Sequence, residues 1–445
     1  MAIHPIEYRY GTDEMKFVWS EANRLEKIMK VEAALARAEA DIGLIPKEAA
    51  DIIGASIGYV ELSRVKEIED EIHHDMMAVV IAMSEKCEED ADKWVHFGAT
   101  SNDMLDTATG LQLKEAVEIL EDRICKLLDV LLLQADAHKK LVCAGRTHGQ
   151  IGVPTTYGLR FAIWASEVAR HIERLEQLKP RLIVGQMTGA VGTQAAFGKD
   201  GIEIQKRVMQ YLEIGSVDVS NQIIQRDRHA EFVMWMANTV TTMDKIGVEI
   251  RSLQRSEIAE VEESFRKKQV GSSTMPHKRN PIKSEQICGL ARIVRAMVEP
   301  ELQNNTLWDE RDLTNSSCER IVFPEACVLT DHIIKLAIGV IENLRFYPEN
   351  IRRNLNLLRG LNMGEAVMIE LAKRGVGRQE AHELVRSSAM EAHETGKHFK
   401  EVLLANPNVA NYLSEEDITN LVDPDKYIGT AVEQVEAVVA KLKRN

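Results

Sequence analysis

Residues 271–281, "GSSTMPHKRNP", bring serines, a histidine, two adjacent cations and two prolines into one short segment. Gly271 allows backbone angles that other residues avoid, so the amides after it can converge on an anion. Lys278 and Arg279 add positive charge, and the helix expected from Ile282 onward points its positive end at the loop. Such a loop could stabilise a carboxylate, and the charge that develops on it when a neighbouring carbon loses a proton. Considered alone, the segment could equally be a surface loop with a helix-capping serine.

A second candidate for proton transfer is His148 in "GRTHGQ", residues 145–150. It stands in a glycine-flanked polar turn beside Arg146 and Thr147, away from any apolar face. Lone histidines are usually structural or exposed, but the ordinary pKa of this residue type suits a general acid or base in such a turn.

The trio His73, His74 and Asp75 raises the question of a metal. Consecutive side chains diverge on a helix, and no HExxH pattern or Cys/His spacing accompanies them. We therefore expect no metal site. The polarity of a helix N-terminus explains the trio as well as a functional role does.

Two arginines and a serine, Arg311, Ser316 and Arg320, fall near the start of an expected helix. Two guanidinium forks and a hydroxyl beside a helix N-terminus suit a phosphate. The alternative is a set of solvated charge pairs. "RDRH" at 226–229 carries the same ambiguity, and there we favour a structural role.

Composition narrows the class of protein. The formal net charge of −14 should repel nucleic acid and anionic membranes, so an anionic substrate needs a local cationic pocket. The six cysteines are scattered without a CxxC pair, which favours small buried hydrophobes over disulfides or metal ligands. Neither a signal pattern nor a run long enough for a membrane span is present. We expect a cytoplasmic protein.

Hydrophobic periodicity predicts long helices. The strongest run, whose steps alternate four and three residues, comprises Leu113, Val117, Leu120, Ile124, Leu127 and Leu131. A second run comprises Phe232, Met236, Thr239, Met243, Ile246, Ile250 and Leu253. Further helices are predicted over 156–178, ended by Pro180, over 282–299, ended by Pro300, and over 317–345, kinked at Pro324. Periodicity does not tell whether the two runs face the chain's own core or another subunit.

The fold class that we predict is therefore all-α with three helical domains. Residues 1–105 and 361–445 carry shorter helical patterns broken by glycine and proline, whereas 106–360 carry the long helices and the loop. We assign an N-terminal helical domain, a central long-helix bundle and a C-terminal helical domain to these ranges.

The loop "GSSTMPHKRNP" resembles the signature of the fumarase/aspartase superfamily, whose members eliminate fumarate or a similar product from a succinyl compound. The superfamily's two other blocks occur in order as "GATSND" and "GRTHGQ". Within it, the chain looks like the adenylosuccinate lyase family. Supporting strings run from "RYGTDEM" through "HHD", "NQIIQRDRH" and "WDERDLTNSSCER" to "YIGTA", so the resemblance covers essentially the whole chain.

The resemblance implies that Ser272 removes a proton and that His148 is the acid. His74, Lys278 and Glu285 are also implied to be catalytic, with Glu285 matching the carboxylate that partners the acid. Substrate contacts are implied for Arg9, Tyr10, His73, His74, Asp75, Thr100, Ser101, Thr147, Gln222, Ser273, Lys278, Arg279, Asn280, Arg311, Ser316 and Arg320. One departure is His73, where relatives often carry arginine.

The implied reaction is β-elimination of fumarate in purine nucleotide synthesis. Adenylosuccinate would give AMP, and the succinylated aminoimidazole carboxamide ribotide (SAICAR) would give AICAR. No metal or other cofactor is expected. Members of the superfamily form homotetramers with a multi-subunit helical core, and their active sites draw on three subunits. The implied partners are thus the succinylated nucleotides, fumarate and other copies of the chain.

Three other functions are compatible with parts of this pattern. The 3-carboxy-cis,cis-muconate cycloisomerase branch can carry an almost identical loop, but it tends to lack the histidine at His148 and binds no nucleotide phosphate. Argininosuccinate lyases usually have Gln-Lys-Lys where His277, Lys278 and Arg279 stand. A catalytically silent helical scaffold is an alternative of a different class, which the intact Ser272 and His148 disfavour.

We predict that Ser272→Ala and His148→Gln each lower kcat by at least ~10²-fold, the usual scale for lost acid–base help. Fumarate release measured by ultraviolet absorbance checks both variants. Near-normal turnover of either variant on both substrates would remove that residue from its role.

Overall fold

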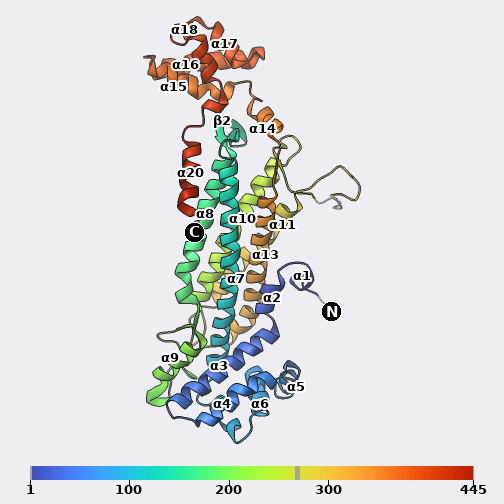
Figure 1. The fold of residues 1–445 in the computed structure, drawn as a ribbon, viewed down its shortest axis with the longest axis vertical. Coiled ribbons are helices and arrows are strands. Elements are labelled where there is room, and N and C mark those ends of the chain that lie inside the picture. Colours follow the sequence, from blue (N-terminus) through green and yellow to red (C-terminus); the bar gives the residue numbers. More distant parts are fainter. Residues whose placement is uncertain (1–2, 266–270, 444–445) are drawn as a thin grey trace. The chain divides into compact units, whose positions relative to one another are not determined.

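The computed structural model describes residues 3–265 and 271–443, and it is mostly helical, as the sequence predicts (Figure 1). The longest helices are α7 (Ser101–Ala137), α8 (Tyr157–Leu182), α10 (Asp227–Leu253), α11 (Ile282–Ala296) and α13 (Thr314–Glu342). None of the described helices is both long and apolar enough to cross a membrane.

Shorter helices occupy both ends of the chain. The N-terminal ones are α1 (Pro5–Tyr8), α2 (Asp13–Val18), α3 (Glu21–Asp41), α4 (Lys47–Ser56), α5 (Leu62–Ile72) and α6 (Asp75–Ser84). Two more, α9 (Gly201–Leu212) and α12 (Val298–Gln303), lie between long helices. The C-terminal ones are α14 (Pro348–Leu355), α15 (Gly364–Lys373), α16 (Arg378–Thr395), α17 (Phe399–Ala405), α18 (Pro407–Ala410), α19 (Glu415–Leu421) and α20 (Ala431–Leu442).

Six short strands, which the periodicity did not predict, pair two by two. β1 (Val142–Thr147) and β2 (Gln150–Thr156) form an antiparallel hairpin. β3 (Val184–Gly185) is parallel to β4 (Gly215–Ser216), and β5 (Val261–Glu262) is antiparallel to β6 (Arg345–Phe346). Each strand connects or flanks helices, so the strands fix loops and do not build a layer of their own.

The chain divides into two compact units. Unit 1 comprises Met1–Cys125, Arg170–Met243 and Ile287–Lys335, and unit 2 comprises Lys126–Ala169, Asp244–Gln286 and Leu336–Asn445. In unit 1, α10 contacts α8 through a hydrogen bond from Trp235 Nε1 to the carbonyl of His171 at 2.9 Å. In unit 2, α7 contacts α13 through Gln134 Nε2 and the carbonyl of Ile341 at 3.1 Å. The three-domain division stays a prediction.

Both apolar runs predicted from the sequence are internal core. Every member of the first run is 0% exposed, and no member of the second exceeds 4%. They therefore do not provide the exposed faces on which another subunit could pack. Apolar side chains that are exposed on the long helices include Leu133, Ile163 and Val248.

Two prolines that were predicted to end helices lie inside helices instead. α8 runs through Pro180 to Leu182, and Pro300 lies inside α12 rather than ending a helix at Glu299. Pro300 lies in the first turn of α12, where a missing N–H costs no intrahelical hydrogen bond, whereas Pro180 lies in the last turn of α8 and lacks the N–H that would bond the Glu176 carbonyl. α13 continues past Pro324, which lies inside it.

A buried carboxylate in the core of unit 1 should make stability depend on pH. Glu39 on α3 is 0% exposed, and neither of its oxygens has a hydrogen-bond partner among the described residues. Burial, assisted by the neighbouring Glu32, raises the pKa of Glu39 to about 8. The folded chain therefore holds a proton that the unfolded chain releases above about pH 4.5.

We predict that the wild-type free energy of unfolding falls as pH rises from about 4.5 to 8, and that Glu39→Gln removes much of this fall. Urea midpoints at several pH values across that window check the change. Glu26→Gln is the matched control, because Glu26 lies on the same helix and its pKa is lowered by its hydrogen bond with Lys30. A Glu39→Gln profile parallel to the wild type would contradict the prediction.

Candidate functional site

Unit 1 encloses a pocket of about 130 Å³ that contains the predicted phosphate-binding residues. Its lining comes from α3, α7 and α13, and from the segments that precede α3, α10 and α13. Arg311, Ser316 and Arg320 all line it, as the sequence predicted. Ser316 lies in the first turn of α13, where its own amide donates to the Leu313 carbonyl at 3.2 Å and the Thr314 amide donates to Asp312 Oδ1 at 2.8 Å, so the side chains and not these amides would bind an anion.

Polar contacts already order the arginines of this pocket. Arg320 Nη2 lies 2.7 Å from Asp75 Oδ2, and Arg24 Nη2 lies 3.8 Å from the same oxygen. Burial alone would raise the pKa of Asp75, but the Met76 amide and these two cations outweigh it and lower the pKa. Asp75 therefore stays ionised and holds Arg320 at the pocket.

Arg311 Nη1 donates to Gln222 Oε1 at 3.1 Å, which joins two of the predicted substrate-binding residues. Gln222 is held in turn by its Nε2, which donates to the carbonyl of Ala190 at 2.9 Å. The Arg311 Nε atom is buried and has no hydrogen-bond partner among the described residues. A donor left in this state is available to an anionic ligand.

Arg226, for which we favoured a structural role, lies at the centre of a buried ion-pair network. Its two terminal nitrogens bind the carboxylate of Asp106 at 2.6 and 2.8 Å. Its Nε and Nη2 bind Glu319 at 2.7 and 3.2 Å. Burial alone would raise the pKa of Glu319, but Arg226 and His229 outweigh it and lower the pKa to about 2.

His229, Glu301 and Glu319 place potential metal-ligand atoms within 4.8 Å of one another, among the described residues. However, both oxygens of Glu319 accept hydrogen bonds from the Arg226 guanidinium. A cationic group thus already occupies the side of Glu319 that a metal would need. The absence of a metal site stays a prediction.

The trio at 73–75 forms a junction between two helices. His73 ends α5 in a left-handed conformation with φ 55°, and Asp75 is the first residue of α6. His74 is the N-cap of α6, and its Nδ1 accepts from the Met77 amide at 3.2 Å. This contact places the ring proton of neutral His74 on Nε2, which is left to donate elsewhere. The N-cap interpretation is thus confirmed, and the substrate contacts stay predictions.

Thr100 and Ser101 form the entry to α7. The Thr100 amide donates to Asp103 Oδ2 at 3.0 Å, and Asp103 also accepts from the amides of Thr188 and Gly189. Asp103 is 0% exposed, and burial raises its pKa to about 6 despite these donors. The carboxylate thereby ties the "GATSND" block to a segment more than eighty positions away in sequence.

Arg9 and Tyr10 follow α1 in unit 1. Arg9 is the exposed C-cap of that helix. The Tyr10 ring is half-buried and lies 5.6 Å from the ring of His332 on α13. No contact among the described residues joins either side chain to Arg311 or Arg320.

The signature loop lies in unit 2. Ser272 Oγ accepts hydrogen bonds from the amides of Thr274 at 3.3 Å and Met275 at 3.0 Å. Two amides that converge on a hydroxyl oxygen would also stabilise the alkoxide, which favours Ser272 as a base. Gly271 is required at the base of the loop, since a Cβ there would lie 2.0 Å from the Lys278 carbonyl oxygen.

One physical expectation for the loop was wrong. The N-terminus of α11 does not offer its amides to a ligand, because Glu263 occupies them. Glu263 is 6% exposed and accepts from the amides of Ser284 at 2.7 Å and Lys283 at 3.2 Å. It also accepts from Ser284 Oγ at 2.5 Å. The positive end of the helix is thus neutralised by the chain itself.

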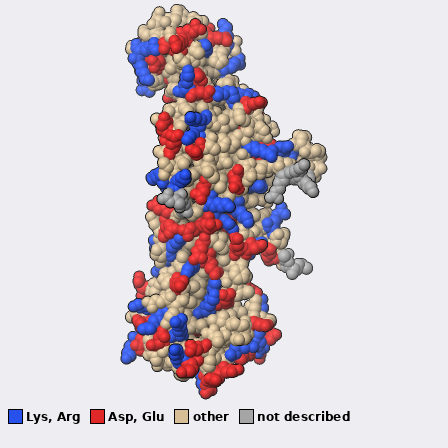
Figure 2. Space-filling model, viewed as in Figure 1, with Lys and Arg blue, Asp and Glu red and all other residues tan. Residues whose placement is uncertain are grey.

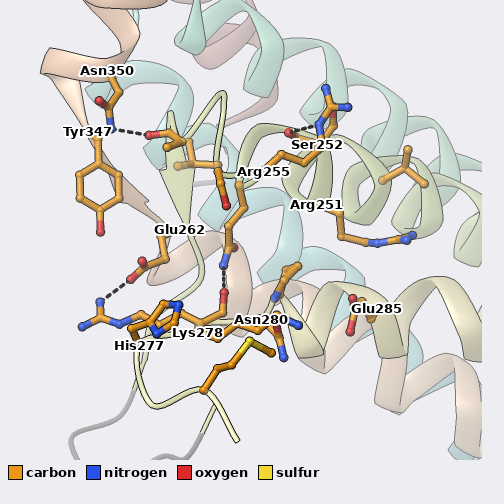
Figure 3. A pocket seen from close by; sticks show the side chains of 18 of the residues that line it. Arg251, Ser252, Arg255, Glu262, His277, Lys278, Asn280, Glu285, Tyr347 and Asn350 are labelled. Atoms are coloured by element: carbon orange, nitrogen blue, oxygen red, sulfur yellow. Dashed lines mark hydrogen bonds and ion pairs between the residues drawn. The ribbon is translucent and has the colours of Figure 1, made fainter. Parts of the chain in front are cut away.

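A cavity of about 1120 Å³ lies beside this loop in unit 2 (Figure 3). Lys278, Arg279, Asn280 and Glu285 all contribute to its lining, whereas Ser272 and Ser273 do not. Arg279 Nη1 pairs with Glu262 at 2.9 Å, and Asn280 Nδ2 donates to the Gly271 carbonyl at 3.0 Å. Figure 2 shows acidic and basic side chains interspersed on the visible face of the molecule. An anionic substrate would therefore depend on local cations such as Lys278 and Arg279 for its binding.

His148 stands at the tip of the β1–β2 hairpin, next to Thr147. Both residues of the turn have positive φ, 54° for His148 and 75° for Gly149, as in the tight turns that suit hairpin twist. His148 and Thr147 are exposed. Within the described part of this chain, no hydrogen bond or ion pair joins His148 to Glu285, so the implied pair stays a prediction.

The predicted site residues therefore fall into two groups. Unit 1 holds those at 9–10, 73–75, 100–101, 222 and 311–320, and unit 2 holds those at 147–148 and 272–285. Sequence reasoning missed four buried carboxylates that hold these segments: Asp103, Asp106, Glu260 and Glu263. Asp103 lies inside a quoted block, and "EVEES" is a run of acids beside the loop, but neither pattern reveals burial.

Comparisons with known proteins agree over the whole chain. Residues 7–296 match the protein family described as Lyase, and residues 360–438 match the one described as Adenylosuccinate lyase C-terminus. The adenylosuccinate lyase of Methanocaldococcus jannaschii is 56% identical, with 100% of this chain and 96% of that protein covered. The enzyme of that name from Methanothermobacter thermautotrophicus is 53% identical, with 100% of both chains covered.

Solved structures have the same fold. A fumarate lyase from Mesorhizobium sp. BNC1 has a TM-score of 0.90 at 32% identity, covering 97% of this chain and 98% of that one. The 3-carboxy-cis,cis-muconate lactonizing enzyme from Pseudomonas putida has a TM-score of 0.90 at 32% identity, covering 98% of both. The sequence identity to the two adenylosuccinate lyases is much higher than to these solved structures, and it extends over the full length. The chain therefore belongs to the adenylosuccinate lyase family.

Proposed function

We propose that this chain eliminates fumarate from adenylosuccinate, giving AMP, and from SAICAR, giving AICAR. The observation that carries the proposal is full-length identity of 53–56% to adenylosuccinate lyases, together with the arginine-lined pocket of unit 1. Both substrates combine a nucleotide phosphate with two carboxylates. Clustered guanidinium groups in an otherwise acidic protein suit such anions.

The nucleotide phosphate is assigned to Arg311, Ser316 and Arg320. Arg311 has a buried Nε donor without a partner, and Ser316 adds a hydroxyl at the first turn of α13. Arg320 also lines the pocket, and its Nη2 is held by Asp75 at 2.7 Å. Arg9, Tyr10, His73, Thr100, Ser101, Thr147 and Gln222 are assigned to the remaining substrate contacts.

Ser272 is assigned as the base. Its deprotonated oxygen takes the β-proton of the succinyl group, and Lys278 and the loop amides stabilise both the alkoxide and the resulting dianionic carboxylate. The electron pair of the broken C–H bond then forms the double bond of fumarate as the C–N bond breaks. Ser273, Arg279 and Asn280 hold the succinyl carboxylates.

His148 is assigned as the acid that protonates the departing nitrogen. Glu285 is assigned as its carboxylate partner, and His74 as a second catalytic histidine whose Nε2 proton is directed by the cap contact of Nδ1. The likeness to the Pseudomonas putida muconate enzyme is weaker, at 32% identity. A cycloisomerase activity is therefore the lesser candidate.

The assay offers purified protein both succinylated nucleotides and follows fumarate by absorbance. Release from both is expected. Release from neither, with lactonisation of 3-carboxymuconate instead, would replace the proposal by the cycloisomerase alternative. A chain inert in all three assays would favour the scaffold interpretation.

Assembly and location are part of the proposal. The site residues at 148 and 272–280 are exposed or half-buried in one chain, and the helices expose apolar side chains. We propose a homotetramer whose active sites combine segments of different subunits, located in the cytoplasm where purine nucleotides are made.

We predict that Arg320→Met weakens binding of the nucleotide far more than binding of its nucleoside analogue. The change keeps length but loses the forked donors, and charged hydrogen bonds contribute roughly 1.5–3 kcal/mol each. Titration calorimetry with the product nucleotide and nucleoside measures the two losses. Arg374→Met is the control, since Arg374 pairs with Asp417 outside the pocket. Equal losses for both ligands would make Arg320 a structural residue.

We also predict that two inactive variants complement each other. His148→Gln and Ser272→Ala proteins are mixed after mild dissociation and then reassociated. If different subunits supply these two residues, some mixed sites regain both native groups, and activity returns without any wild-type chain. Mixtures that are proven hybrids but stay as inactive as their parents would refute the shared site for this pair.

A further inference from the structure

Glu260 is a buried carboxylate in unit 2 that binds three segments far apart in sequence. It is 0% exposed. Its Oε2 accepts from the hydroxyl of Tyr157, at the start of α8, at 2.5 Å. Its Oε1 accepts from Asn354 Nδ2 of α14 at 2.9 Å and from Arg146 of β1. A carboxylate removed from water is tolerated only with such partners, and removing them is costly.

These partners keep Glu260 charged. Burial alone would raise the pKa of Glu260, but the hydrogen bonds from Arg146, Tyr157 and Asn354 outweigh it and lower the pKa. The contact to Arg146 is therefore a charge-assisted pair, the strongest class of side-chain hydrogen bond.

Arg146 lies two positions before His148, on the strand that leads to the hairpin tip. The β1–β2 register shifts between Ala144 and Arg146, so the ladder is irregular below the tip. Between this irregularity and the turn, the strands form two pairs, Arg146 with Ile151 and Thr147 with Gln150. Two backbone pairs therefore hold the tip beyond the irregularity, and the Arg146 side chain adds a second anchor to them.

The other end of this anchor is rigid. The Glu260 amide donates to the Leu253 carbonyl at 3.0 Å, and the Glu260 carbonyl accepts from the Tyr347 amide at 2.9 Å. The next residues pair with β6. Ala259 adopts φ 49°, which costs energy for a residue with a side chain and persists only where its surroundings enforce it.

We infer that Glu260 is a positioning residue for His148, acting through Arg146. The inference rests on the proposed function, in which His148 is the acid. Glu260 lies in the interior and fixes the direction in which the hairpin tip presents the imidazole. Proton transfer depends steeply on such placement, and a displacement of about 1 Å can cost 10²-fold in rate.

The first test is Glu260→Gln, which keeps the size of the side chain but loses the charge opposite Arg146. We expect kcat to fall roughly 10- to 100-fold with KM nearly unchanged, because placement of the acid matters only as the transition state forms. Asp425→Asn is the matched control. Asp425 also pairs with an arginine in unit 2, Arg352 at 2.9 Å, but on the surface, and both constants should stay at wild-type values.

The decisive readout is a double-mutant cycle with His148→Gln. If Glu260 acts through His148, Glu260→Gln should lower kcat by less than about threefold once His148 is absent. A residue that only stabilises the fold would give the same loss in both backgrounds. The inference would be overturned if the two fold-losses in kcat multiplied in the double variant, or if Glu260→Gln alone left kcat unchanged.

A second variant covers the case in which Glu260→Gln does not fold. Arg146→Lys keeps the positive charge but removes the forked donor, and the same non-additivity with His148→Gln is expected. Additive losses there would also overturn the inference. Wild-type protein that releases no fumarate would instead defeat the proposed function, so the two failures are distinguishable.

Discussion

The candidate site depends on one constraint: apart from the hairpin tip at His148, its segments lie in loops or at helix ends, where backbone amides lack partners within regular structure. Buried carboxylates meet this need. Asp103 binds the Thr100 amide just before α7, Glu263 binds the amides of Lys283 and Ser284 that open α11, and Asp106 accepts from the Ile224 amide at 2.8 Å. Because a buried carboxylate is stable only with its donors in place, each of these residues fixes the loop that it contacts.

The helical fold was predictable from particular residues. The apolar run from Leu113 to Leu131 predicts one face of a helix. In the structure the run lies on α7, and each of its apolar members is buried. Helix ends were less predictable. Pro300 lies in the first turn of α12, where a missing N–H costs no hydrogen bond, and Pro180 lies in the last turn of α8, which continues only two residues past it. The short strands were missed because two to seven residues carry too little periodicity to register.

Candidate residues of the site could be named where the chemistry is local in sequence. The glycine, hydroxyls and cations in 271–280 predict an anion-binding loop, which stays a prediction, and the structure adds that Ser272 Oγ accepts two amides of this loop. The supports of the site were not predictable, since Glu260 meets Arg146, Tyr157 and Asn354 across about a hundred positions. Nothing in the local pattern of "EVEES" separates such a carboxylate from solvated ones.

The exposure of the proposed acid and of the loop lysine links catalysis to assembly. His148 and Lys278 are exposed in the chain, yet fixed donors stabilise an alkoxide or a departing nitrogen best where bulk water does not compete. In the same unit, Leu133, Ile163 and Val248 are 70%, 56% and 51% exposed on long helices. Contact with other copies of the chain would cover such apolar side chains. If the same contact also shields the hairpin tip and the loop, the association that stabilises the assembly would exclude water from the reacting groups. A dissociated subunit would then fold its own core but lack the desolvated surroundings that its catalytic side chains need.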